Sequence, residues 1–110
     1  MVSMAAARQI ALSLPDTTEA PHHDMSSFRV NQKIFATVPD GTHLHVMVDE
    51  DETAMAVAGC PSGCDELWWG KRLSGVRVDL TQVDRQLLTE LLTEAWRRRA
   101  PKALLAKLEK

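Results

Sequence analysis

The residues best suited to chemistry are cations and aromatic rings that gather in one turn of the chain. Residues 68–72 read Trp-Trp-Gly-Lys-Arg, so two indole rings lie next to two cations. Lysine and arginine bind phosphates, and tryptophan stacks on bases or inserts into a groove. The pattern predicts a nucleic-acid-binding surface on this turn, extended by cations from neighbouring strands. The predicted residues are Lys71, Arg72, Arg77, Arg29, Lys33 and Trp69.

A simpler interpretation of this turn stays open. The tip of a hairpin is normally solvated and charged, whatever its function. Trp68 and Trp69 would then anchor the tip to the core. The two interpretations differ in whether the indole rings are exposed or covered.

Three arginines, Arg97, Arg98 and Arg99, close a long helical segment. Cations in the last turn of a helix are favoured by the helix dipole. Glu90 and Glu94 lie one turn earlier, where they can pair with Arg97 and Arg98. The end of the helix explains this cluster, so we leave it outside the predicted surface.

The histidines and cysteines do not match a recognised metal site. His43 and His45 share a strand face, and Cys60 and Cys64 supply two thiols. A three-residue cysteine gap on an irregular loop, combined with histidines from remote strands, is not a recognised zinc pattern. We expect surface histidines, free thiols, no metal and no cofactor.

Motifs of the common enzyme classes are missing from the sequence. It has no Gly-x-Ser-x-Gly elbow, phosphate loop or dinucleotide-binding fingerprint. A cysteine and a histidine can form a nucleophile pair, but nothing in the pattern places such a pair together. We therefore expect a protein that is not an enzyme, with no catalytic residue and no small-molecule substrate.

The composition bounds the class of protein. A chain of 110 residues with 25% charged residues suits a single globular domain, residues 1–110. The formal net charge is −2, whereas dedicated nucleic-acid binders are usually basic, so that role needs a local patch. No apolar run is long enough to span a membrane, no secretory signal is present, and two cysteines are too few for a disulfide framework. We expect a cytoplasmic protein.

The first half of the chain predicts a helix followed by an antiparallel meander. Ser3 caps a helix that Pro15 ends. Residues 28–38 predict a hairpin with a two-residue loop, in which Phe28 lies opposite Phe35. The other expected elements are an edge strand within residues 19–24, a turn at residues 39–41 and a strand over residues 44–48.

The second half predicts a short helix, one strand and a long helix. Asp49 caps the short helix, and residues 60–67 form an irregular connection. A strand follows over residues 76–80, and Thr81 caps the long helix. The apolar stripe of that helix consists of Leu87, Leu88, Leu91, Leu92, Ala95 and Trp96. Together the elements predict a two-layer α+β domain, an antiparallel sheet with helices packed on one face.

Four groups of residues, spread over most of residues 10–105, have a recognisable order and spacing. They are Ala11-Leu12-Ser13-Leu14-Pro15-x-x-Thr18-Glu19; Ser27-Phe28-Arg29-Val30-x-x-Lys33-Ile34-Phe35-Ala36-Thr37; Gly70-Lys71-Arg72 with Val76-Arg77-Val78-x-Leu80; and Leu91-Leu92-x-Glu94-Ala95-Trp96-x-x-x-Ala100-Pro101-Lys102. In this the chain resembles the MmcQ/YjbR family of small bacterial proteins. The resemblance implies a fold like that of the bacterial frataxin CyaY and a double-wing arrangement proposed to bind DNA. An iron role like that of frataxin is not expected, because residues 1–14 contain no acid.

The expected function is therefore a DNA-binding module that contacts the phosphates of double-stranded DNA through its basic hairpin. The alternative is a non-enzymatic module that binds a protein partner. It would use the open face of the sheet or the hairpin with Trp68 and Trp69, because exposed tryptophan is common at interfaces.

Overall fold

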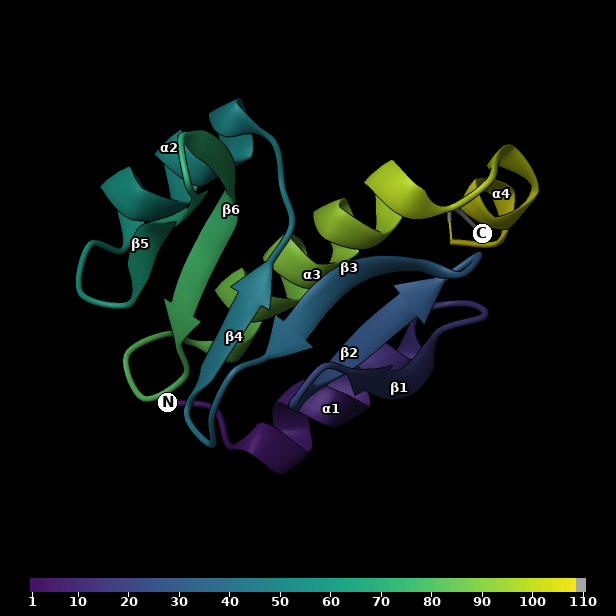
Figure 1. Cartoon of the computed structure of the whole chain (residues 1–110), viewed down its shortest axis with the longest axis horizontal. Coiled ribbons are helices and arrows are strands. Elements are labelled where there is room, and N and C mark those ends of the chain that lie inside the picture. Colours follow the sequence, from purple (N-terminus) through teal and green to yellow (C-terminus); the bar gives the residue numbers. More distant parts are fainter. Residues whose placement is uncertain (109–110) are drawn as a thin grey trace.

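The computed structural model describes residues 1–108 and shows an antiparallel sheet with helices (Figure 1). Within these residues the sheet has six strands, in the order β1-β2-β3-β4-β6-β5. The elements are α1 (Met4–Ser13), β1 (Thr18–His22), β2 (Met25–Val30), β3 (Lys33–Val38), β4 (His43–Val46), α2 (Glu50–Gly59), β5 (Cys64–Trp69), β6 (Arg72–Asp79), α3 (Arg85–Arg99) and α4 (Lys102–Leu108).

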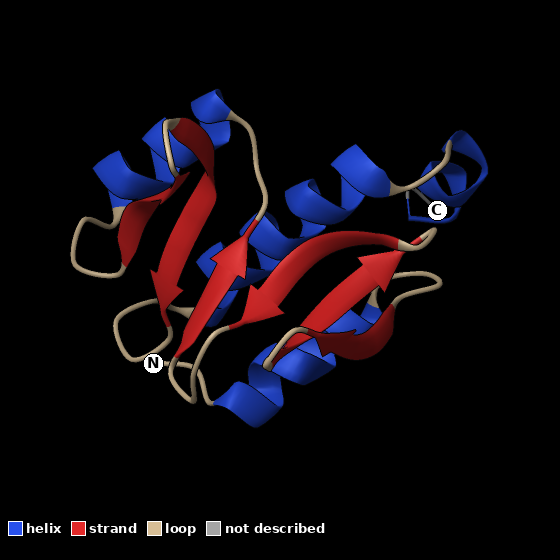
Figure 2. Ribbon diagram, in the orientation of Figure 1, coloured by secondary structure: helices blue, strands red, loops and turns tan. Residues whose placement is uncertain are grey.

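The helices cover one face of the sheet, as the predicted α+β class requires. Helix α3 packs on β3 and β4, α2 packs on β5 and β6, and α1 packs beside α3. Figure 2 shows α1 and α3 behind the strands, so the front of the sheet is its open face. The apolar stripe of α3 is buried as predicted except at Leu87, which is partly buried. Trp96 donates a 3.0 Å hydrogen bond from Nε1 to the carbonyl oxygen of Pro15.

Side-chain caps fix where the helices begin. Ser3 Oγ accepts a 3.1 Å hydrogen bond from the Ala6 amide, and Asp49 Oδ1 accepts one of 2.8 Å from the Glu52 amide, as predicted. The predicted cap at Thr81 is wrong. Asp84 caps α3 instead, and Thr81 donates its amide and hydroxyl to Asp79 Oδ1. The residues before α3 form a local turn, because an aspartate side chain can satisfy the backbone two residues on.

The hairpin between β2 and β3 has the predicted loop but a different register. Asn31 and Gln32 have φ angles of 53° and 65°, the left-handed conformation of a tight hairpin turn. The predicted pairing of Phe28 with Phe35 is wrong, because Phe28 lies opposite Ala36 and the register shifts beyond it. The shift adds a residue to β3, and both aromatic rings are fully buried.

The predicted irregular connection over residues 60–67 is also wrong in its second half. Residues from Cys64 onward form β5, an edge strand that pairs with β6. Strand β6 begins at Arg72, four residues before the predicted strand. The pairing of β5 is irregular between Leu67 and Trp68, so its side chains do not alternate strictly between the two faces.

The sheet splits where β4 ends. Strand β4 pairs with β3 only at two positions and with β6 only as far as Val46, so the first residues of β3 and β6 diverge. Residues 47–49 cross the gap, and the Met47 amide donates a 2.9 Å hydrogen bond to the carbonyl of Phe35. Gly75 permits the close approach of β6, since a Cβ at this position would collide with the carbonyl oxygen of Val46. The split gives the open face a hollow between the two halves of the sheet.

Candidate functional site

A cavity of about 700 Å³ occupies the split. The lining comes from the β2–β3 hairpin, the start of β6, the C-terminal end of α3 and residues 47–50. The lining residues are His22, Arg29, Gln32, Lys33, Ile34, Thr37, Met47, Val48, Asp49, Glu50, Trp69, Arg72, Leu73, Ser74, Arg98 and Arg99. Segments remote in sequence therefore build one concave surface.

The lining of this cavity is strongly cationic. Among the lining residues five carry a positive charge and two, Asp49 and Glu50, carry a negative one. One of the acids is already engaged, because Asp49 caps α2. The whole chain has a net charge of −2, so the cavity is a local exception to its acidic balance. We define the cationic cavity by its charged lysine and arginine residues: Arg29, Lys33, Arg72, Arg98 and Arg99.

Backbone and side-chain oxygens hold two of these arginines. Arg29 donates from Nε to Ser27 Oγ at 3.0 Å and from Nη2 to the carbonyl of Pro21 at 3.0 Å. Arg98 donates from Nη1 to the carbonyl of Met47 at 2.9 Å. A guanidinium has five N–H donors, so each arginine is oriented and still has donors for a ligand.

The five cations of the cationic cavity outnumber the acids in its lining, which are Asp49 and Glu50. In residues 1–108, none of the five side chains forms an ion pair. Burial lowers the pKa of Arg99, and the neighbouring charges of Arg98 and Arg72 lower it further. The Nε atom of Arg99 is buried and has no hydrogen-bond partner in the described part of the chain. An anion bound in the cavity would relieve the repulsion among these cations.

The structure brings together four of the six residues predicted for the binding surface. Arg29, Lys33, Trp69 and Arg72 line the cavity. Lys71 lies at the exposed tip of the β5–β6 turn and is not part of the lining.

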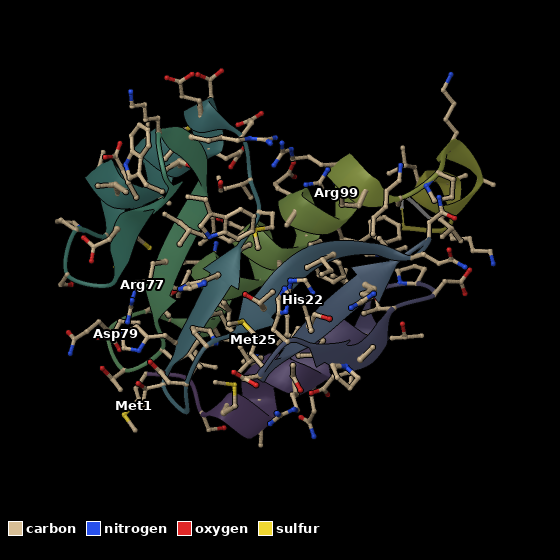
Figure 3. The ribbon with its side chains drawn as sticks, in the orientation of Figure 1. Met1, His22, Met25, Arg77, Asp79 and Arg99 are labelled. Atoms are coloured by element: carbon tan, nitrogen blue, oxygen red, sulfur yellow. The ribbon has the colours of Figure 1, made fainter. Side chains whose placement is uncertain are left out.

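Arg77 lies elsewhere on the open face. Figure 3 shows Arg77 beside Asp79, well away from Arg99. Its guanidinium is 3.9 Å from Asp40, so its charge is partly compensated. Hydrogen bonds from the Thr42 amide and from His43 lower the pKa of Asp40 to about 2, which keeps this carboxylate charged.

The exposure of the tryptophans bears on the alternative interpretation of the hairpin. Trp68 is 51% exposed and Trp69 is 55% exposed, so neither ring anchors the hairpin in the core. Trp69 contributes to the cavity and pairs in register with Arg72. Trp68 is outside the lining and donates a 3.3 Å hydrogen bond to Glu66.

Sequence reasoning missed Arg98 and Arg99. Arg97 does pair with Glu94, at 3.5 Å, as the interpretation of a helix end predicted. The helical spacing of the sequence could have indicated that Arg99 faces inward. It follows Ala95 by four residues and Trp96 by three, so it occupies the next position of the buried stripe. A cation at an apolar position is a sign of a buried or functional role.

The two cysteines do not line the cavity. Cys60 and Cys64 are free thiols near the end of α2. In residues 1–108, no three His, Cys, Asp or Glu side chains are grouped so that they could hold a metal ion. The helices of this part of the chain are all too short or too polar to cross a bilayer.

Comparisons with known proteins place the chain in a family. The fold is similar to the crystal structure of a Deinococcus radiodurans protein with a domain described as DUF419, with a TM-score of 0.76 and 21% identity. The alignment covers 99% of this chain and 89% of that one. No curated protein matches the chain. The family model described as YjbR matches residues 12–98, most of the sequence. The chain therefore belongs to the YjbR family.

Proposed function

We propose that the protein is a nucleic-acid-binding module, not an enzyme, and that the cationic cavity is its contact surface. The observation that supports this proposal is the gathering of five cations from four separate elements, without ion-pair partners in the described residues. Lysine and arginine bind backbone phosphates and release condensed counterions. The contact surface is the hollow beside the hairpin instead of the hairpin tip, and it includes the predicted residues Arg29, Lys33, Trp69 and Arg72.

The salt dependence of DNA binding tests this proposal. Affinity for labelled DNA should fall steeply with salt, with a log–log slope of roughly −0.9 per phosphate contact on a duplex and −0.7 on a single strand. The Arg72→Ala/Arg99→Ala double variant should bind more weakly, and its slope should be shallower by roughly 1.4 to 1.8, since two contacts are lost.

The chain offers a matched control for this double variant. Arg77 lies on β6 like Arg72, and Arg85 lies on α3 like Arg99, but neither lines the cavity. The Arg77→Ala/Arg85→Ala variant therefore removes the same charge from the same two elements. Equal effects of the two double variants would show that only net charge matters. A native protein that binds no DNA in low salt would end the proposal.

A second candidate function is binding of a protein partner through β5. The specific observation is Trp68, which lies on an edge strand, outside the cavity, with half of its surface exposed. An edge strand can accept a further strand, and exposed tryptophan is a frequent anchor at interfaces. Such binding would be sensitive to Trp68→Ala and insensitive to salt, whereas the proposed DNA binding has the opposite pattern.

A further inference from the structure

The size and form of the cavity bear on which nucleic acid it can hold. A volume of about 700 Å³ is typical of pockets for small molecules. Proteins that read a duplex usually insert a protruding helix or ribbon into a groove. Here the cationic groups line a hollow instead. A hollow of about 700 Å³ has room for a nucleotide unit and is too small to enclose a double helix.

The lining contains the two kinds of group that a nucleotide needs. Arg72 of β6 and Arg98 and Arg99 of α3 all line the cavity, and the charges of Arg72 and Arg98 act on Arg99. Three neighbouring guanidinium groups suit a phosphate. Trp69 is adjacent to Arg72 across the β5–β6 ladder and exposes 55% of its surface. An indole in this position can stack on a base. The face of a base is freely available in a single strand, whereas neighbouring base pairs cover it within a duplex.

The rest of the lining suits the base itself. Ile34, Met47 and Leu73 contribute apolar surface for the face of a ring. Gln32 and Ser74 contribute neutral donors and acceptors for its edge. A site for inorganic phosphate alone would need neither the apolar nor the neutral polar residues. A nucleotide uses the cations for its phosphate, Trp69 for stacking, and the apolar and neutral polar residues for its base.

We propose that the cavity binds one unpaired nucleotide, with its base stacked on Trp69 and its phosphate held by Arg72, Arg98 and Arg99. This inference rests on the proposed function and adds that the bound strand is single. The same chemistry is present in a free nucleotide, so the test must separate an unpaired nucleotide within a strand from a free one.

The experiment uses the full-length chain and four probes: a short thymidine strand, the duplex of the same sequence, thymidine monophosphate and inorganic phosphate. Binding is followed by anisotropy of labelled strands and by quenching of tryptophan fluorescence. The single strand should bind more tightly than the duplex and quench the fluorescence. Trp69→Ala should weaken binding of the single strand by about fivefold or more and remove most of the quenching.

Two variants separate stacking from a general effect on the fold. Trp68→Ala removes a neighbouring ring of similar exposure from outside the cavity, so it should leave affinity unchanged. Trp69→Phe keeps an aromatic ring and should retain most of the binding. If Trp69→Ala and Trp68→Ala behave alike, or if the duplex binds as tightly as the single strand, the unpaired-nucleotide inference is wrong and nucleic-acid binding survives.

The remaining outcomes distinguish the two proposals. If thymidine monophosphate binds as tightly as the strand and depends on Trp69, the nucleotide site is supported and the nucleic-acid function is overturned. If inorganic phosphate competes with the strand as well as thymidine monophosphate does, base stacking is excluded. If none of the four probes binds, both proposals fail.

Discussion

The guanidinium of Arg98 donates a 2.9 Å hydrogen bond to the carbonyl oxygen of Met47, which lies 51 residues earlier in the chain. The Met47 amide in turn donates to the carbonyl of Phe35. These two bonds connect α3, on the covered face of the sheet, to the segment that crosses the split and then to β3. The cavity therefore depends on a long-range contact between a helix end and a loop.

We predict that Arg98→Met lowers the free energy of unfolding by about 1 kcal/mol, because the carbonyl of Met47 loses its charged donor. Arg98→Met should also weaken DNA binding, since the cavity loses a cation. Urea denaturation and anisotropy measure the two effects. The control is Arg85→Met, an exposed arginine at the other end of α3 that should change neither. Equal stability of the two variants would contradict the role given to the Arg98–Met47 bond.

Gly75, which lies within β6, should tolerate substitution poorly. Its φ angle is 154°, and a Cβ would collide with the carbonyl oxygen of Val46. Backbone strain of this kind costs about 1–3 kcal/mol, and the collision adds to it, so Gly75→Ala should strongly destabilise the protein in urea. Gly41→Ala is the control, because a Cβ at Gly41 meets nothing within 4 Å and should change stability by less than about 0.5 kcal/mol. Equal midpoints for the two variants would refute the prediction.

Much of the fold is predictable because its signals are local. Ser3, Asp49 and Pro15 mark helix ends through contacts within a few residues, and the period of α3 is visible in its leucines. The loop of the β2–β3 hairpin is predictable for the same reason. Strand β5 is not, because the irregularity beside Trp68 breaks the alternation that identifies a strand.

The cavity cannot be predicted from local sequence patterns. It exists because β4 stops pairing at Val46, so that β3 and β6 diverge. Arg98 and Arg99, from the end of α3, line the gap. No pattern around Arg98 indicates that its partner is Met47. The residue types around Trp69 and Arg72 predict a binding turn from the local sequence. Its position relative to Arg99 depends on the curvature of the whole sheet.

The loop between β2 and β3 offers a stabilising substitution. Gln32 has a φ angle of 65°, and the left-handed conformation costs an ordinary residue roughly 1–2 kcal/mol. Glycine avoids most of this cost and loses part of the gain to backbone entropy, so Gln32→Gly should stabilise the protein by about 0.5–1 kcal/mol. Thermal unfolding would show this as a higher Tm. Asn31→Gly should gain less, because asparagine tolerates this conformation better. A lower Tm for Gln32→Gly would mean that its side chain makes contacts worth more than the strain.

The two free thiols should differ in their response to pH. Burial raises the pKa of Cys64 from 9.0 to about 11, and the neighbouring Cys60 contributes to the shift. The thiolate is the reactive form, so Cys64 should resist alkylation at about pH 8 while the partly exposed Cys60 reacts. Because the pKa is higher in the folded state, the protonated thiol favours folding below the ordinary value. That contribution should be lost as the pH rises toward 11.

A Cys60→Ser variant isolates the buried thiol and measures its titration. Its alkylation rate should keep rising with pH beyond 9.0, because burial, the largest cause of the shift in the pKa of Cys64, remains. Unfolding in urea should restore the ordinary rate and serves as the control for reagent access. A rate that levels off near 9.0 in the native protein, or that equals the unfolded rate at about pH 8, would show that Cys64 is open to solvent. The end of α2 would then pack less tightly against β5 and β6 than the structure shows.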